Sequence, residues 1–142
     1  MNPDPMLLPM AALMAWTVLM GLVLVGRRAG DIRRQKAAGV ALPGTRGAKS
    51  GYYADKTEAA SDHFQNLFET PTLFYALCLG LIVAGAAGTI AVALAWAYVG
   101  LRIVHSLIHI TYNVVMHRAL VFFLSVGVLL ALIALLINAA LT

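Results

Sequence analysis

Five polar side chains follow one another at helical spacing inside an apolar stretch of this chain: Tyr98, Arg102, His105, His109 and Tyr112. Residues three or four apart share one face of a helix, so a single face carries all five. Guanidinium and imidazole groups bind anions and transfer protons, but a charge at mid-bilayer costs about 2.5 to 3.5 kcal/mol on insertion scales. The stripe therefore indicates a functional site that faces the protein interior. We expect Glu69 to be the partner of Arg102.

The composition indicates a single domain inside a membrane. The chain has 142 residues, of which 61% are hydrophobic and 11% are charged, and its mean hydropathy is +0.85. It is too apolar for a soluble domain and too short for two domains. Crossing the hydrocarbon layer takes about 20 residues, and four segments reach that length: residues 7–25, 67–87, 89–112 and 120–141. We predict an all-α, integral membrane four-helix bundle over residues 1–142, with a connection at about residues 26–63.

The basic residues predict how the bundle is oriented. Eight of the ten Lys and Arg residues lie between the first and second spans, and Arg118 lies between the third and fourth. Because cytoplasmic connections carry the excess of basic residues, we expect both termini outside the cytoplasm, in the inner or plasma membrane. No Lys or Arg precedes the first span, so no signal peptide is expected. The basic segments lack interleaved aromatic residues, and no nucleic-acid partner is predicted.

Polar residues also occur at the start of the second span. Asn66 and Glu69 are three residues apart and share a helix face, which can lie against the polar stripe of the third span. Pro71 lacks an N–H group and frees backbone carbonyls nearby. These residues predict a water-accessible, charged pocket in the cytoplasmic half of the bundle. Cys78, within the second span, is expected to be a packed core thiol.

These motifs resemble those of a known family. The segment Asn66-Leu67-Phe68-Glu69-Thr70-Pro71, then Arg102-Ile103-Val104-His105, then Arg118 thirteen residues after His105, is similar to the MAPEG family, the membrane-associated proteins in eicosanoid and glutathione metabolism. A bacterial-type member is the best match to this length and topology. The resemblance implies a homotrimer that binds glutathione between subunits, with membrane lipids and a small hydrophobic electrophile as its other partners.

The resemblance also assigns roles to individual residues. It implies that glutathione is held by residues on three of the predicted spans or their ends, namely Arg27, Asn66, Glu69, Arg102, His105 and His109. Arg27 would reach the ligand of the neighbouring subunit. Arg118 would be the catalytic residue, because a guanidinium close to the sulfur stabilises the nucleophilic thiolate. Glutathione carries two carboxylates and one amine, which matches several arginines with one acid nearby.

The chain departs from the family pattern at several positions. Gln65 stands directly before the motif asparagine, where family members often have an arginine, and His63 occupies the vicinity of a second such arginine. His109 and Phe122 replace tyrosines found in several members, the first four residues after the histidine of the third span and the second four residues after Arg118.

Three functions are compatible with these residues. The first is a membrane-bound transferase or peroxidase that uses glutathione or a related thiol on hydrophobic electrophiles. The second is a non-catalytic lipid-binding or scaffold protein with the same fold. In the third, His105, His109 and Glu69 ligate a metal. Arg102, one turn away, would repel the cation, so no metal site is predicted.

Overall fold

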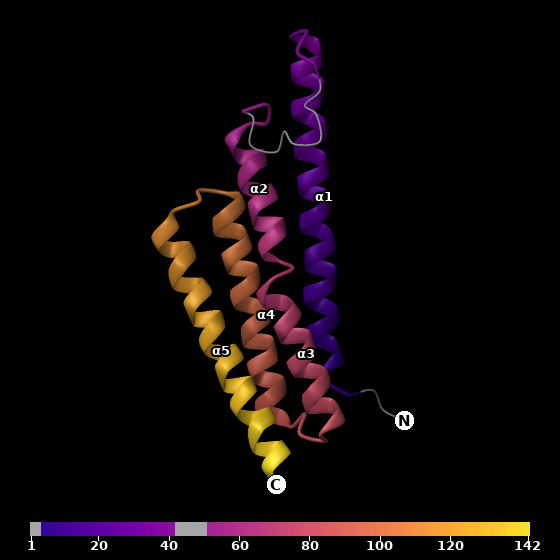
Figure 1. The fold of residues 1–142 in the computed structure, drawn as a ribbon, viewed down its shortest axis with the longest axis vertical. Coiled ribbons are helices and arrows are strands. Elements are labelled where there is room, and N and C mark those ends of the chain that lie inside the picture. Colours follow the sequence, from indigo (N-terminus) through magenta and orange to yellow (C-terminus); the bar gives the residue numbers. More distant parts are fainter. Residues whose placement is uncertain (1–3, 42–50) are drawn as a thin grey trace.

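The computed structural model describes residues 4–41 and 51–142. These ranges contain helices and no strand, which confirms the predicted all-α fold (Figure 1). The helices are α1 (Leu7–Ala37), α2 (Asp55–Asn66), α3 (Thr70–Val83), α4 (Thr89–Ile110) and α5 (Val115–Leu141). Arg46 and Lys49 of the predicted basic connection lie outside the described residues.

Four segments of the described chain are long and apolar enough to cross a membrane, and they make this an integral membrane protein. They are α1, α2 with α3 as one unit (Asp55–Val83), α4 and α5. In Figure 1, α1 begins and α5 ends at the same end of the bundle. This arrangement is the one expected for a chain that crosses the bilayer an even number of times.

Helical structure extends beyond the boundaries expected from the sequence. The helix α1 continues twelve residues past the expected end of the first span, to Ala37, and α2 begins at Asp55, within the expected connection. Residues 27–38 are rich in Arg, Lys, Gln and Ala, which favour helix once a first turn exists. Hydropathy marks where the apolar segment ends, whereas a helix continues into the polar region until its hydrogen bonds stop.

The second crossing is interrupted between α2 and α3. Pro71 lies in the first turn of α3, where its missing N–H needs no partner, and residues 67–69 form turns. The carbonyl of Asn66, the last residue of α2, receives from the main chain only a long bond, from the Glu69 N–H at 3.4 Å. This break lies beside the middle of α4 in Figure 1.

The apolar core fills the half of the bundle nearest the chain ends. Its centre is a stacked pair of rings, Phe74 on α3 and Tyr98 on α4, with centroids 4.6 Å apart. The other buried residues of this cluster come from all four crossings: Met6, Met10, Leu13, Cys78, Leu81, Ala91, Ala95, Val99, Leu129 and Leu132. Cys78 is fully buried, as expected. The core leaves the opposite half of the bundle to polar side chains.

Side chains of α1 fasten the start of α2. Ala54, the N-cap residue of α2, provides no side-chain cap. Instead the buried Asp31 of α1 accepts a hydrogen bond from the Ala54 N–H at 3.0 Å, and its other oxygen accepts one from Arg34. A carboxylate at a helix N-terminus also interacts favourably with the helix dipole. The acid on α1 therefore does the capping that the sequence of α2 lacks.

This cap can be tested by replacing Asp31 with Ala. Loss of an N-terminal cap costs about 0.5 to 2 kcal/mol, so we expect amide hydrogen exchange in the first turn of α2, at Thr57 and Glu58, to become about tenfold faster. Exchange in α3 should not change. Asp62→Ala, which removes an exposed acid of α2 itself, is the matched control. Equal protection in Asp31→Ala and the unaltered protein would contradict the capping role.

Candidate functional site

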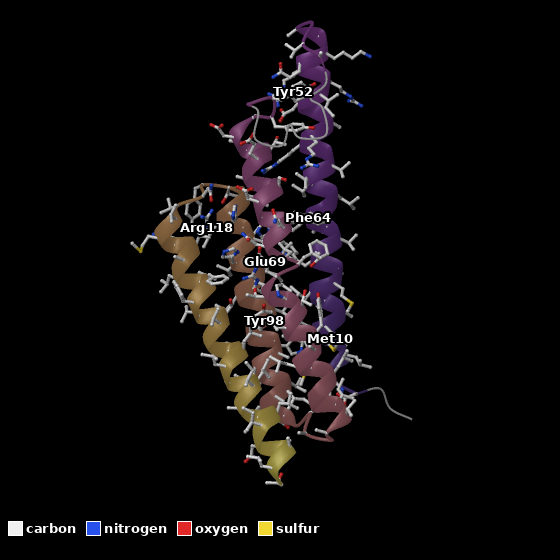
Figure 2. The ribbon with its side chains drawn as sticks, in the orientation of Figure 1. Met10, Tyr52, Phe64, Glu69, Tyr98 and Arg118 are labelled. Atoms are coloured by element: carbon white, nitrogen blue, oxygen red, sulfur yellow. The ribbon has the colours of Figure 1, made fainter. Side chains whose placement is uncertain are left out.

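A cavity of about 250 Å³ opens where α2 ends, between α4 and α5. Seven residues line it: Asn66, Glu69, His105, Val115, Arg118, Ala119 and Phe122. Four of these, Asn66, Glu69, His105 and Arg118, are candidate site residues from the sequence. Figure 2 shows Glu69 beside the break in the second crossing and Arg118 at the start of α5. Three helices separated in sequence thus bring polar groups to one void.

Arg102 lies fully buried on α4, in contact with residues of the cavity wall. Its Nη2 donates to the Asn66 carbonyl at 3.5 Å, and its guanidinium lies 5.9 Å from the centre of the Phe122 ring. Within residues 4–41 and 51–142, its Nε and Nη1 have no hydrogen-bond partner. No ion pair joins it to Glu69 in these ranges, so the expected partnership is wrong at the level of direct contact. The carbonyl released by the helix break takes that place instead.

Three imidazole rings gather beside this guanidinium. His105 and His109 on α4 are both buried, as the spacing indicates, and their ring centroids are 5.8 Å apart. The buried His63 of α2 completes the group, 5.9 Å from His105 and 5.1 Å from His109. His63 is not among the site residues predicted from the sequence, because residues 26–63 were expected to form a connection. Its position three residues before Asn66 is the signal that could have placed it on the same helix face.

Arg118 is held at the mouth of the cavity by two acceptors. Its Nη1 donates to Asn113 Oδ1 at 2.9 Å and lies 3.1 Å from His109 Nε2. An arginine has only donors, so His109 Nε2 must be the acceptor and the ring must be neutral, with its hydrogen on Nδ1. Phe122 stands at a position where several family members have a tyrosine. It lies in the same wall, with its ring centroid 6.2 Å from that of His105.

Among the residues singled out in the sequence, Arg27 and Tyr112 lie away from this cavity, and His109 lines a smaller neighbouring one. Arg27 on α1 bridges backbone groups of two other helices: its Nη1 donates to the Lys56 carbonyl at 2.7 Å and its Nη2 to the Ile110 carbonyl at 3.0 Å. Within this chain it therefore caps the end of α4. Tyr112 lies beyond the last residue of α4 and is 57% exposed, so the buried stripe ends at His109.

The charges around the cavity favour an anion. Arg118 lines it and Arg102 lies against its wall, and Glu69 is the single acid among the lining residues. Buried arginine N–H groups without acceptors carry an unfavourable desolvation energy, which a carboxylate of a ligand would offset. Across the described residues, no group of three or more His, Cys, Asp or Glu side chains could hold a metal ion.

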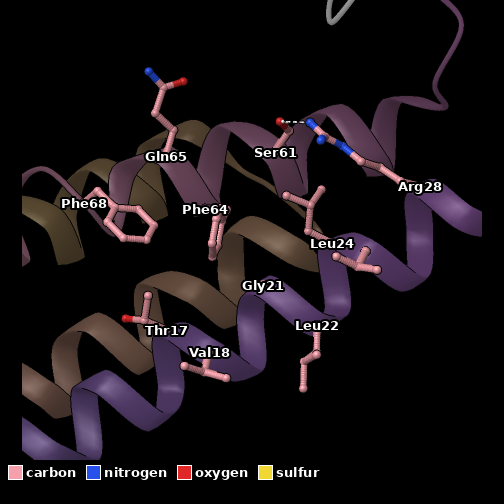
Figure 3. Close-up of a pocket in the computed structure, with 11 residues that line it drawn as sticks. Thr17, Val18, Gly21, Leu22, Leu24, Arg28, Ser61, Phe64, Gln65 and Phe68 are labelled. Carbon is pink, nitrogen blue, oxygen red and sulfur yellow. Dashed lines mark hydrogen bonds between the residues drawn. The ribbon is translucent and has the colours of Figure 1, made fainter.

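A larger cavity, about 620 Å³, lies on another face of α2, against α1 (Figure 3). Val18, Gly21 and Leu22 of α1, Phe64 of α2 and Phe68 of the following turn make it mainly apolar. At one end, Arg28 donates a hydrogen bond to the Ser61 hydroxyl at 2.9 Å. This groove has no acid and base pair, so it fits an apolar chain better than a chemical step.

Comparisons with known proteins give one match. A model for the MAPEG family matches residues 6–138, which is nearly the whole chain. Neither the curated proteins nor the solved structures contain a match.

The unpartnered nitrogens of the Arg102 guanidinium lead to a prediction about stability. Arg102→Met removes a buried charge whose Nε and Nη1 have no acceptor, and replacing such groups by an apolar side chain of similar size is neutral or stabilising. We expect the free energy of unfolding, measured by dodecyl sulfate titration in mixed micelles, to rise by about 1 to 3 kcal/mol. Arg33→Met, at an exposed arginine of α1, is the control. A loss of stability in Arg102→Met would show that this chain itself compensates the charge.

Proposed function

Because this chain belongs to the MAPEG family, we propose that it is a membrane-bound enzyme that uses glutathione, or a related thiol, to attack hydrophobic electrophiles and to reduce lipid hydroperoxides. The family membership supports a membrane protein of glutathione or eicosanoid metabolism. The transferase and peroxidase activities are the proposal.

The observation that carries the proposal is Arg118 in the wall of a cavity, with the fully buried Arg102 behind that wall, against Asn66 and Phe122. Two carboxylates and one amine are the charged groups of glutathione. Arg102 has two unpartnered nitrogens within the described chain, and Glu69 lines the same void as Asn66 and His105. The arginine would take a carboxylate of the tripeptide and Glu69 its amine, with Asn66 and His105 completing the polar contacts. His109 does not line this cavity, and its Nε2 faces Arg118, so it would act on the ligand through that arginine.

Arg118 is proposed to activate the thiol. The S–H proton passes to water, and the guanidinium stabilises the resulting thiolate. In transfer, the thiolate sulfur attacks the electrophilic carbon of the substrate, a C–S bond forms, and the leaving group departs with its bonding electron pair. In the reduction of a lipid hydroperoxide, two thiols become one disulfide and the products are an alcohol and water.

The proposal includes an assembly and an orientation. The active form would be a homotrimer with its cavities open to the cytoplasm and both termini outside, in the inner or plasma membrane. Arg27 would meet the ligand of the neighbouring subunit. Since its two Nη atoms already hold the ends of α2 and α4 together, this role requires its guanidinium to serve both purposes.

A second candidate function is non-catalytic lipid binding or scaffolding. The apolar groove between α1 and α2 favours it, because a volume of about 620 Å³ is in the usual range for small-molecule sites. Calorimetric titration in detergent separates the two functions. Saturable heat with glutathione supports the enzyme. No glutathione heat, together with binding of a fatty-acid derivative, would support the scaffold and overturn the enzyme.

The catalytic assignment is tested by Arg118→Ala. Removal of one group that stabilises developing charge lowers turnover by about 10²- to 10³-fold, and we expect this loss in kcat for glutathione transfer to a chlorinated nitrobenzene. The oligomeric mass in detergent, measured by light scattering, should not change. Arg33→Ala is the charge-matched control at an exposed position. Unchanged turnover in Arg118→Ala would refute the catalytic role.

A further inference from the structure

The turn between α4 and α5 has an unusual residue at its centre. In residues 4–41 and 51–142, Asn113 is the one non-glycine residue with a positive φ, at 50°. Left-handed backbone strains most side chains, and glycine is the residue that adopts it freely, although asparagine tolerates it. The carboxamide of this asparagine has a charged partner, because its Oδ1 accepts a hydrogen bond from Arg118 Nη1 at 2.9 Å.

The main chain fixes this asparagine from both sides. Its N–H donates to the Ile108 carbonyl at 2.8 Å, which closes the last turn of α4. On the α5 side, the Arg118 N–H donates to the Val114 carbonyl at 3.1 Å within the first turn of that helix. The carboxamide of Asn113 and the side chain of Arg118 therefore project from backbone that cannot rotate freely.

Both acceptors of Arg118 converge on the same nitrogen. Nη1 carries two hydrogens, and it has two partners, Asn113 Oδ1 at 2.9 Å and His109 Nε2 at 3.1 Å. A planar guanidinium held at one Nη atom by two acceptors has a set orientation. Its Nε and Nη2 make no such bond within the described residues and are left for the cavity that Arg118 lines.

The side chain of His109 is itself held by packing against a neighbouring helix. His109 is 3% exposed, and its ring packs 5.1 Å from that of His63 on α2. A small cavity of about 140 Å³ lies on the side of α2, and both His109 and Asn113 line it. The two acceptors thus line one cavity and contact Arg118, which lines the other.

We propose that Asn113 and His109 are positioning residues, which hold Nη1 of Arg118 so that its remaining N–H groups face the thiol bound in the cavity. The kinetic part of this inference rests on the proposed thiol chemistry. The geometric part concerns this chain alone and is testable without substrate.

The kinetic test is Asn113→Gly, which keeps the left-handed backbone and removes only the carboxamide. Hydrogen bonds to charged groups contribute about 1.5 to 3 kcal/mol, and His109 remains, so we expect kcat to fall about tenfold. KM for glutathione should change less than about twofold, because the lost interaction matters in the transition state. A less well placed guanidinium also leaves the thiol less acidic, so the midpoint of the pH profile of kcat/KM should move to higher pH.

Two variants of the histidine extend this test. His109→Leu removes the second acceptor and should give the same alkaline shift, whereas His109→Gln offers a carbonyl oxygen and should restore most of the activity. His117→Ala, next to Arg118 in sequence and in contact with Tyr112 instead, is the control. A purely structural defect would lower the amount of active protein without moving the midpoint. An unmoved midpoint in both Asn113→Gly and His109→Leu overturns the proposal.

A measurement without substrate separates this inference from the proposed function. In protein labelled with ¹⁵N-arginine, a pinned Arg118 guanidinium should rotate slowly and show resolved Nη resonances, assigned by their loss in Arg118→Lys. Asn113→Gly should merge them. Suppose that the unaltered protein has no thiol-transfer activity, yet its Nη resonances are resolved and those of Asn113→Gly are merged. The proposed function then fails, while the positioning of Arg118 by Asn113 and His109 is supported. Merged Nη resonances in the unaltered protein would overturn the positioning of Arg118 by these two residues.

Discussion

Pro71 imposes the constraint on which the polar half of this bundle depends. Without an N–H group it cannot bond to the carbonyl of Leu67, four residues before it, and the second crossing is made of two helices with a turn at residues 67–69. The turn leaves the Asn66 carbonyl available, and the fully buried Arg102 uses it as its acceptor. A continuous helix would hide this carbonyl. Asn66 and Glu69, at the two ends of this interruption, both line the cavity.

Three of the residues in which this chain differs from the family pattern, His63, His109 and Phe122, lie around the two arginines, whereas Gln65 lines the apolar groove. His63 and His109 pack against each other, His109 accepts from Arg118, and Phe122 covers the guanidinium of Arg102. A tyrosine hydroxyl at the position of His109 would offer a donor as well as an acceptor, whereas a neutral imidazole with its hydrogen on Nδ1 presents only an acceptor to the arginine. The substitutions at His109 and Phe122 therefore change how Arg118 and Arg102 are held, whereas Gln65 and His63 replace arginines of the family pattern.

Bonds from side chains to backbone join the helices at the end of the bundle where α2 begins. Arg27 links α1 to the carbonyls of Lys56 and Ile110, and Asp31 links it to the N–H of Ala54. The bonds to the Ile110 carbonyl and the Ala54 N–H satisfy backbone groups at helix ends, which would otherwise lack a partner. The long extension of α1 thereby sets the position of α2, and α2 in turn brings His63 to α4.

The sequence by itself determined the number of crossings and the buried face of α4. Apolar segments of spanning length predict helices in a membrane, and the spacing of Tyr98, Arg102, His105 and His109 places them on one side, because both patterns are properties of a single helix. Tyr112 continues the spacing but not the helix, since Asn113 reverses the chain. The tertiary structure decided which partners these side chains meet: Asn66 rather than Glu69 for Arg102, His63 for the other histidines, and Asn113 for Arg118. Periodicity along one helix contains no information on how far a neighbouring helix is shifted or rotated against it, and only packing sets that register.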